Sequence, residues 1–284
     1  MSKTTVGASI LVLAAVAGGA SAQDISTVNG YYTQLRVFND FPTTTLSYGH
    51  AGGPLLPEPT PGVPSNNALA GLNAGLQFHE TFAQGSLGNF ANKHQGLFSN
   101  NGGVSPFGVS NQQSFIINTT VSISAPASNG NPRKEAGLVF YNDHGGGFID
   151  EGRVLVASDN GEVAVFGAAM NFTGFGTNVY TLGTTAQIHF EYWGPGSQGP
   201  TAEYRLLFTD AVTGPHDSGL VTFDTNSANG FLSGSTLGFV DQNQRNPTVV
   251  DDINVIYGNV SVIPAPGAAA LLGLAGLVAI RRRR

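Results

Sequence analysis

Residues 186–193 read AQIHFEYW, and residues 202–209 read AEYRLLFT. In the first run apolar and polar side chains alternate, so Ile188, Phe190 and Tyr192 fall on one side of an extended chain. The second run alternates in the same way, and a period of two is typical of a β-strand with one buried face. The two runs therefore predict neighbouring strands of a sheet.

Similar runs continue in both directions along the chain. Turn signals separate them, of which Asp-Asn-Gly at 159–161 marks the clearest hairpin, and the 39 glycines and 15 prolines suit tight turns better than long helices. This pattern favours an all-β fold, an antiparallel sandwich or a barrel. The other expected strands are residues 114–124, 136–141, 153–157, 162–166, 219–223, 235–240 and 252–257.

Three local motifs resemble one family of β-sandwiches. FHETF at 78–82 is similar to the opening strand of the concanavalin-like, laminin-G-type jelly roll, and EAGLVF at 135–140 to an inner strand of its convex sheet. TLGF at 236–239, followed by DDINV at 251–255, is similar to its closing pair. The resemblance implies an antiparallel jelly-roll β-sandwich over residues 78–260. A different β-sandwich is the alternative.

The segment before this region, residues 23–77, is less regular. We expect residues 28–38 and 43–48 to pair as a hairpin. Residues 52–64 read GGPLLPEPTPGVP, and the five prolines predict an extended loop inside or before the sandwich.

The N-terminal segment has the three parts of a secretory signal peptide. Lys3 supplies the charged start, residues 6–17 are apolar but too short to span a bilayer, and Ala20-Ser21-Ala22 fits the small-x-small cleavage rule. We therefore expect residues 1–22 to be removed, with Gln23 as the first mature residue.

The C-terminal segment predicts a membrane address. Pro264-Ala265-Pro266 precedes an uncharged run at 267–280, and Arg281, Arg282, Arg283 and Arg284 follow. As a helix the run would reach about 21 Å against a hydrocarbon core of about 30 Å, a short transmembrane helix with its arginines on the cytoplasmic side. A buried core helix is the alternative.

Residues 263–284 resemble the PEP-CTERM sorting signal of bacterial surface proteins, here with Pro-Ala-Pro in place of the usual Pro-Glu-Pro. The resemblance implies processing by an exosortase-type enzyme, transient anchoring in the inner membrane, and delivery to the cell surface or the extracellular matrix. It also implies an association with exopolysaccharide.

Charge and cysteine content limit the partners of the exported region. Five of the 12 basic residues lie in the terminal segments, so residues 23–263 carry seven basic and 18 acidic side chains, a formal charge of −11. Such a field disfavours nucleic acid and can attract cations such as calcium. The absence of cysteine excludes disulfides and thiolate chemistry.

A candidate glycan-binding face follows from the two opening runs. His189, Glu191 and Trp193 share one side of the first run, and Arg205 lies on the polar side of the second, where it could pair with Glu191 or Glu203. The alternative is a solvated sheet face. A glycoside hydrolase needs two suitably spaced carboxylates, and the first run offers only Glu191, so we expect no enzyme.

Oxygen-rich turns suggest calcium as a cofactor. Asp143 and Asp150 flank the glycines at 145–147, and Asp241 and Asp251 lie near the closing pair of strands. Carboxylate oxygens are the ligands that Ca²⁺ prefers, although the spacing matches no EF-hand and turn formation is the favoured explanation of these residues.

Together these observations predict an exported, non-enzymatic β-sandwich at the cell surface that binds polysaccharide. A purely structural or adhesive surface protein without a small ligand, and a divergent glycan hydrolase, are the alternatives.

Overall fold

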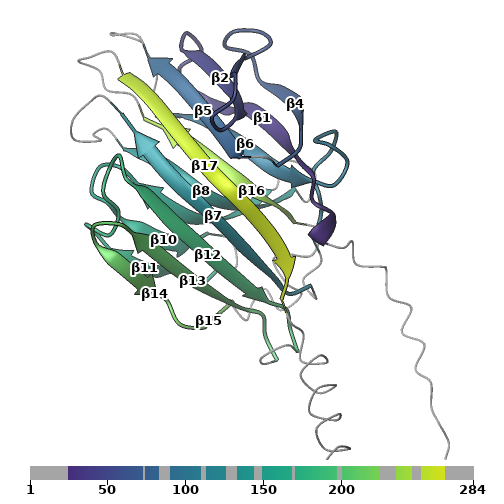
Figure 1. The fold of residues 1–284 in the computed structure, drawn as a ribbon, viewed down its shortest axis with the longest axis vertical. Coiled ribbons are helices and arrows are strands. Elements are labelled where there is room, and N and C mark those ends of the chain that lie inside the picture. Colours follow the sequence, from purple (N-terminus) through teal and green to yellow (C-terminus); the bar gives the residue numbers. More distant parts are fainter. Residues whose placement is uncertain are drawn as a thin grey trace, which may run out of the picture.

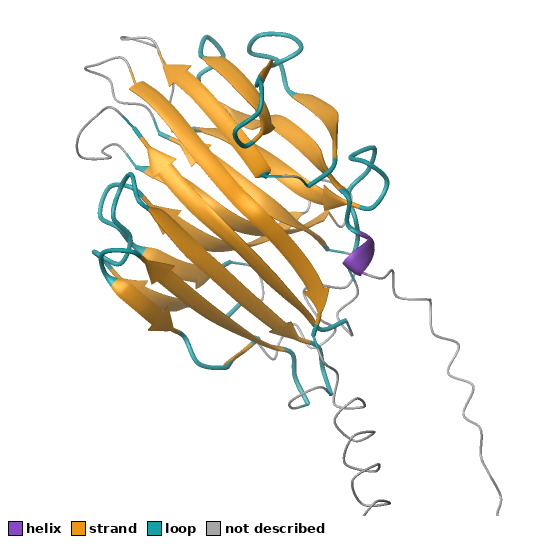
Figure 2. Cartoon of the chain, viewed as in Figure 1, coloured by secondary structure: helices purple, strands orange, loops and turns teal. Residues whose placement is uncertain are grey.

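The computed structural model describes residues 25–72, 74–82, 90–109, 113–125, 133–143, 149–167, 170–196, 200–223, 235–244 and 251–265. Within these residues nearly all regular structure is β-strand, and the helical part is a three-residue 3₁₀ turn, η1 (Ile25–Thr27) (Figure 2). The all-β prediction is therefore confirmed.

The strands form two antiparallel sheets that pack face to face as a sandwich rather than closing into a barrel (Figure 1). Sheet A contains, in spatial order, β11 (Thr173–Gly176), β10 (Val163–Phe166), β9 (Ile149–Ala157), β8 (Lys134–Asp143), β16 (Thr236–Asn243), β6 (Asn92–Ser99), β1 (Gly30–Asn39) and β4 (Ser65–Ala70). Sheet B contains β14 (Gly214–Asp217), β13 (Glu203–Asp210), β12 (Thr185–Trp193), β7 (Phe115–Ser124), β17 (Asp251–Pro264), β5 (Gly75–Phe82), β2 (Thr45–His50) and β3 (Leu56–Pro57), and β15 (Val221–Thr222) pairs with β13.

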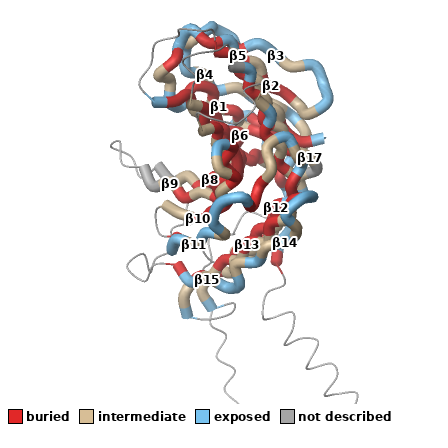
Figure 3. Tube along the Cα trace, turned by 90° about the vertical axis from the view of Figure 1, so that its left-hand side faces the viewer, coloured by how far each residue is buried: buried red, intermediate tan, exposed pale blue. Residues whose placement is uncertain are grey.

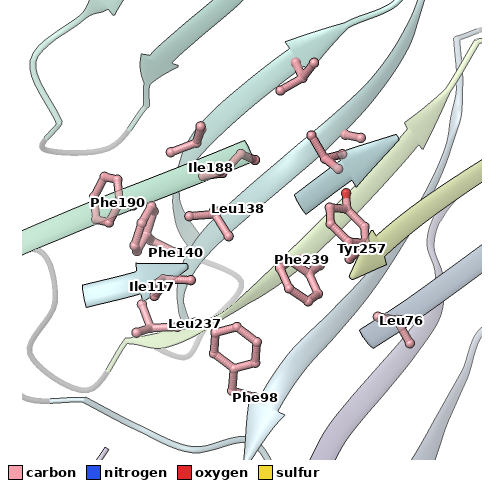
Figure 4. Packing of buried hydrophobic residues seen from close by; sticks show 14 of the residues in the cluster. Leu76, Phe98, Ile117, Leu138, Phe140, Ile188, Phe190, Leu237, Phe239 and Tyr257 are labelled. Atoms are coloured by element: carbon pink, nitrogen blue, oxygen red, sulfur yellow. The ribbon is translucent and has the colours of Figure 1, made fainter. Parts of the chain in front are cut away.

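Most of the interior between the sheets is apolar and aromatic, and the buried positions gather between the two layers (Figure 3). Phe239 of sheet A stacks on Tyr257 of sheet B at a centroid distance of 4.1 Å, and Phe140 meets Phe190 at 4.9 Å (Figure 4). Ile188 and Tyr192 are also buried, so the alternation in β12 correctly identified its inward face.

One end of the interior is polar instead. Arg36, Glu58, Glu80, His94 and Asp241, which we call the buried ion cluster, have almost no exposed surface. A β-bulge in β1 between Gln34 and Phe38, with Arg36 at a φ of 57°, turns the Arg36 side chain inward. The bulge thereby brings a cation from sheet A to the carboxylates.

Hydrogen bonds satisfy the cations of this cluster. The Arg36 guanidinium forms a bidentate ion pair with Glu58 and also donates to the Thr44 carbonyl at 2.8 Å. The backbone N–H of Arg36 donates to Nδ1 of His94, so Nε2 of that ring carries the proton that faces Glu80, 3.3 Å away. Burial by itself raises the pKa of Glu80, but His94 and hydrogen bonds from Thr44 and Asn92 outweigh it, and the net shift is downward.

The structure corrects one expectation for residues 23–77. The expected hairpin is wrong, because β1 pairs with β4 and β6 in sheet A while β2 pairs with β3 and β5 in sheet B. Thr44, between the two strands, is buried against Arg36 and Glu80, so the chain crosses here from one sheet to the other. The segment from Gly30 to Ala70 thus supplies strands to both sheets.

The residues that the structure describes include no helix long and apolar enough to cross a membrane. Ala20, Ala22 and Gln23 of the expected signal-peptide cleavage site, and Pro266 with Arg281–Arg284 of the expected sorting signal, lie outside the described residues.

Candidate functional site

The outer face of sheet A, the side turned away from sheet B, is concave. Lys93 of β6 and Glu151 of β9 form an ion pair of 2.7 Å on this side, although β16 and β8 lie between their strands. Three strand spacings of about 4.8 Å each separate these backbones, so the two side chains meet because the sheet curves toward them. We call this side the concave face. Residues 135–140, expected in the convex sheet, lie instead in this concave one as part of β8.

The floor of the concave face is apolar and bordered by two tyrosines. Leu97, Val139 and Val240 form a buried cluster, and Tyr32 and Tyr141 pack against it, partly exposed. Two glycines also occupy this side, Gly137 and Gly238. A Cβ at Gly238 would come within 2.2 Å of the Gly96 carbonyl, so the close approach of β16 and β6 requires glycine there.

Charged residues form a network at one end of the concave face. Arg153 pairs with both Glu151 and Glu135 and donates to the Gln242 carboxamide at 3.1 Å. Arg133 continues the network to Glu135 at 2.7 Å and to Glu162 at 2.8 Å. These ion pairs, together with that of Lys93, are called the outer ion network.

The network also shifts the pKa values of its members. Burial lowers the pKa of the Lys93 ammonium, and Glu151 offsets only part of that shift. Burial raises the pKa of Glu151, but the charges and hydrogen bonds of Arg153 and Lys93 outweigh it, so the net shift is downward. Glu151 is therefore held as a carboxylate.

Two glutamines lie beside this network, directly opposite each other on β1 and β6. Gln95 is fully buried, and neither atom of its carboxamide has a hydrogen-bond partner in the described part of the chain. The Oε1 atom of Gln34 has none either. Leaving a buried polar group unsatisfied costs about 1–3 kcal/mol, so this pair of amides is an unusual feature of a folded chain.

The glycan face expected from the sequence lies on the opposite side of the molecule, on the outer face of sheet B. His189, Glu191 and Trp193 share that side as predicted, and Glu191 accepts hydrogen bonds from both: Nε2 of His189 at 2.9 Å and Nε1 of Trp193 at 3.3 Å. Nδ1 of His189 contacts Oδ1 of Asn118 at 2.6 Å. The polar groups of this patch therefore satisfy one another.

Arg205 belongs to the same side but pairs with Asp217 of β14, through Nε at 2.9 Å and Nη2 at 2.5 Å, rather than with Glu191 or Glu203. The expected cross-strand partners are thus wrong. β14 pairs with the edge of β13 that faces away from β12, and it brings the Asp217 carboxylate to Arg205 there. The hydrogen bonds from Arg205 and from the backbone of Gly219 lower the pKa of Asp217 to about 2.

A cavity of about 470 Å³ is a further feature of the outer face of sheet B. It is lined by Gln77, His79, Ser124, Ala125, Asp252 and Asn254. His79 contacts Asp252, and Nε2 of Gln77 donates to Asn254 at 2.7 Å, so these polar groups also bond to one another. The free amide atoms of the concave face have no counterpart among these lining residues.

The proposed calcium ligands are distributed over both sheets. Asp241 is buried between the sheets, where its Oδ2 accepts a hydrogen bond from Asn243 at 3.0 Å, whereas Asp251 begins β17 in sheet B. Asp143 and Asp150 lie near the ends of β8 and β9, and their side chains are outside the described set. Among the described residues no group of three or more His, Asp or Glu could hold a metal ion. Calcium binding stays a prediction.

The Pro-Ala-Pro motif begins inside the fold. Pro264 is the last residue of β17 and pairs with Phe115, and the N–H of Ala265 donates to the Ser114 carbonyl at 3.0 Å. The sandwich therefore extends beyond residue 260, up to the first two residues of Pro-Ala-Pro.

Comparison with known proteins gives only distant likenesses of fold. No family model matches the chain, and no curated protein matches it. Arcelin-5, a lectin-like defense protein from Phaseolus vulgaris, is similar with a TM-score of 0.42 and 10% identity over 82% of this chain and 98% of its own. Lectin II from Ulex europaeus gives 0.40 and 10% over 64% and 87%, and a marine alginate lyase from Aplysia kurodai gives 0.41 and 9% over 67% and 84%. These likenesses are too distant to bear on the function.

Proposed function

We propose that this chain is an exported, non-enzymatic protein of the cell surface or extracellular matrix that binds polysaccharide across the concave face of sheet A. The observation that carries the binding proposal is Gln95, a buried carboxamide without a partner, beside an apolar floor and two tyrosines. The concave face thus replaces the sheet B patch as the proposed glycan site.

The chemistry of the face suits sugars. A pyranose has apolar C–H faces that pack on tyrosine rings and aliphatic side chains, and hydroxyl groups that need both donors and acceptors. Tyr32 and Tyr141 flank the floor of Leu97, Val139 and Val240, and a carboxamide offers two donors and an acceptor. The partly exposed tyrosines thus offer a stacking surface, and the buried carboxamide of Gln95 offers hydrogen-bonding groups on the same side of the sheet.

The state of the carboxyl groups supports a binding function rather than hydrolysis. A two-carboxylate glycosidase needs one carboxyl group that keeps its proton near neutral pH. The pKa of Glu151 on the concave face is instead lowered, with Arg153 and Lys93 beside it. Asp241, whose net pKa shift is upward because of its burial, is enclosed between the sheets.

The export proposal rests on the two terminal segments. The signal-peptide pattern of residues 1–22 and the Pro-Ala-Pro, apolar run and arginines of residues 264–284 support export, transient inner-membrane anchoring and an exosortase-type processing partner. We also assign the sandwich to the jelly-roll class. Its connections cross repeatedly between the sheets, as from β5 to β6, β6 to β7 and β7 to β8, which supports that class.

Binding is tested by affinity electrophoresis of the full chain through gels that contain one polysaccharide each, with calcium and with EDTA. Tyr32→Ala is expected to restore free migration, whereas Trp193→Ala, the matched aromatic change on sheet B, leaves retardation intact. Loss of retardation only in Trp193→Ala would move the site to sheet B. No retardation in any gel, from a folded protein, would favour a structural or adhesive role, and release of reducing sugar that disappears in Glu191→Gln would favour a hydrolase.

Export is tested separately by cell fractionation and intact mass. We expect the protein outside the cell to lack residues 1–22 and the residues after the Pro264 region. A full-length product in the cytosol would contradict export, and an extracellular product that retains Arg281–Arg284 would contradict processing.

A further inference from the structure

The basic side chains of the concave face are already paired, and this bears on whether a polysaccharide bound there would be neutral or acidic. Each of the three basic side chains that the structure describes on this face, Lys93, Arg133 and Arg153, is paired with at least one carboxylate. Recognition of a uronate or a sulfate needs a cation that can pair with it. An acidic polymer would have to break existing ion pairs and approach Glu135 and Glu151.

The polar atoms on the concave face that lack a hydrogen-bond partner in the described chain belong to uncharged side chains. Both carboxamide atoms of Gln95 and the Oε1 atom of Gln34 have no hydrogen-bond partner in the described chain. The two glutamines are directly opposite in the register of β1 and β6, and Asn66 of β4 lies opposite Gln34 in turn. This row of amides runs from the exposed edge of the sheet at Asn66 to the buried centre at Gln95.

A row of amides matches hydroxyl groups. Each carboxamide places a donor and an acceptor in one plane, and two neighbouring sugar hydroxyls can bond both of them, since a hydroxyl donates and accepts. Tyr32 lies two residues before Gln34 and on the same side of β1, where a sugar ring held by the amides can stack.

We infer that the concave face selects a neutral polysaccharide, whose hydroxyl groups bond the carboxamides of Gln95 and Gln34 once the side chains that cover these amides move aside, and rejects polymers of uronic acids. The inference rests on the proposed function and names the substrate class of the same site. It is independent of the ion pairs on sheet B, because those residues lie on the other side of the sandwich.

The test compares two sets of polysaccharides and one matched pair of variants. The full chain is titrated calorimetrically with neutral polymers (a β-glucan, a mannan and a galactan) and with acidic ones (alginate, polygalacturonate and hyaluronan). Gln95→Leu keeps nearly the same volume and removes both unpartnered atoms. Gln187→Leu is the same change at an exposed position on the outer face of sheet B.

We expect at least one neutral polymer to bind, and Gln95→Leu to weaken that binding about tenfold or more, while Gln187→Leu leaves it unchanged. The urea midpoint of Gln95→Leu should stay the same or rise, since the variant no longer buries unsatisfied atoms. A purely structural glutamine would instead lower the midpoint on substitution, which would overturn the inference.

The remaining outcomes separate the two proposals. Tighter binding of the acidic polymers, or neutral binding that Gln95→Leu leaves unchanged, would overturn the inference and keep the polysaccharide-binding function. Binding of neither set would overturn both.

Discussion

Strands β6 and β16 each carry two kinds of charge network, one on either side. On the inner side His94 and Asp241 belong to the buried ion cluster, and on the outer side Lys93 and Gln242 belong to the outer ion network. The buried ion cluster has almost no access to water, whereas the charged side chains of the outer ion network keep between 13% (Lys93 and Arg153) and 28% (Glu162) of their surface exposed. The comparison teaches that one alternating strand can place a fully buried charge network on one side and a partly exposed one, where we propose recognition, on the other.

The largest difference is expected when a cation is removed from the inner network. Arg36→Met leaves the Glu58 carboxylate buried without its bidentate partner, and breaking such a pair costs about 3–5 kcal/mol. The free energy of unfolding, measured with urea at pH 7, should fall by that amount. A fall below 1 kcal/mol would mean that water reaches Glu58.

The inner network should also make stability depend on pH in a particular direction. Burial first, and the charge of Glu80 second, raise the pKa of Asp241 well above its ordinary value, and Lys134 and Asn243 offset this in part. Tyr257 also faces this carboxyl. A carboxyl with a raised folded pKa contributes stability that is complete below the unfolded pKa of about 4 and is lost as pH rises toward the folded value, at up to about 1.4 kcal/mol per pH unit.

Asp241→Asn should remove that loss. The variant is expected to be more stable than the parent protein at pH 7.5, with a difference that shrinks toward zero near pH 4, as measured by urea unfolding at each pH. Glu80, whose pKa is lowered, has the opposite slope, since its contribution is lost as pH falls. Because Glu80 is present in both proteins, the difference between them reports Asp241 together with its electrostatic coupling to Glu80. A constant difference across the pH range would contradict the assignment.

The smallest effect is expected in the outer network. Arg153→Met leaves Glu151 paired with Lys93 and Glu135 paired with Arg133, so the loss should be about 1–2 kcal/mol by the same unfolding measurement. Arg205→Met removes an exposed ion pair on sheet B and serves as the control, with no measurable change in midpoint. An Arg153→Met loss as large as that of Arg36→Met would mean that the two networks do not differ.

The central and C-terminal strands could be predicted from the sequence because their two sides differ in polarity. β12 alternates between Ile188, Phe190 and Tyr192 inside and His189, Glu191 and Trp193 outside, and the expected run agrees with the strand to within one residue. The Asp-Asn-Gly turn at 159–161 also connects β9 and β10 as predicted.

β6 could not be predicted from the sequence, because the polar residues that give it contacts on both sides of the sheet also remove its alternation. Its sequence, NKHQGLFS, places polar residues on both sides, His94 toward the buried ion cluster and Gln95 toward the concave face. Without alternation the period-two signal disappears. The inward orientation of Arg36 could not be predicted either, since it depends on a β-bulge that has no recognisable local sequence motif. The signal that could have identified the concave face is the amide-rich pair of Gln34 and Gln95, which only the register brings together.

The position of β17 has a mechanical consequence. This strand of 14 residues lies between β7 and β5 and ends at Pro264, where Ala265 is still bonded to Ser114. A pull on the chain beyond Ala265 acts along the axis of β17, at right angles to its hydrogen bonds with β7. Those hydrogen bonds then bear the force together, in shear, instead of breaking one after another. A molecule held by its C-terminal end would therefore resist mechanical unfolding by fluid flow.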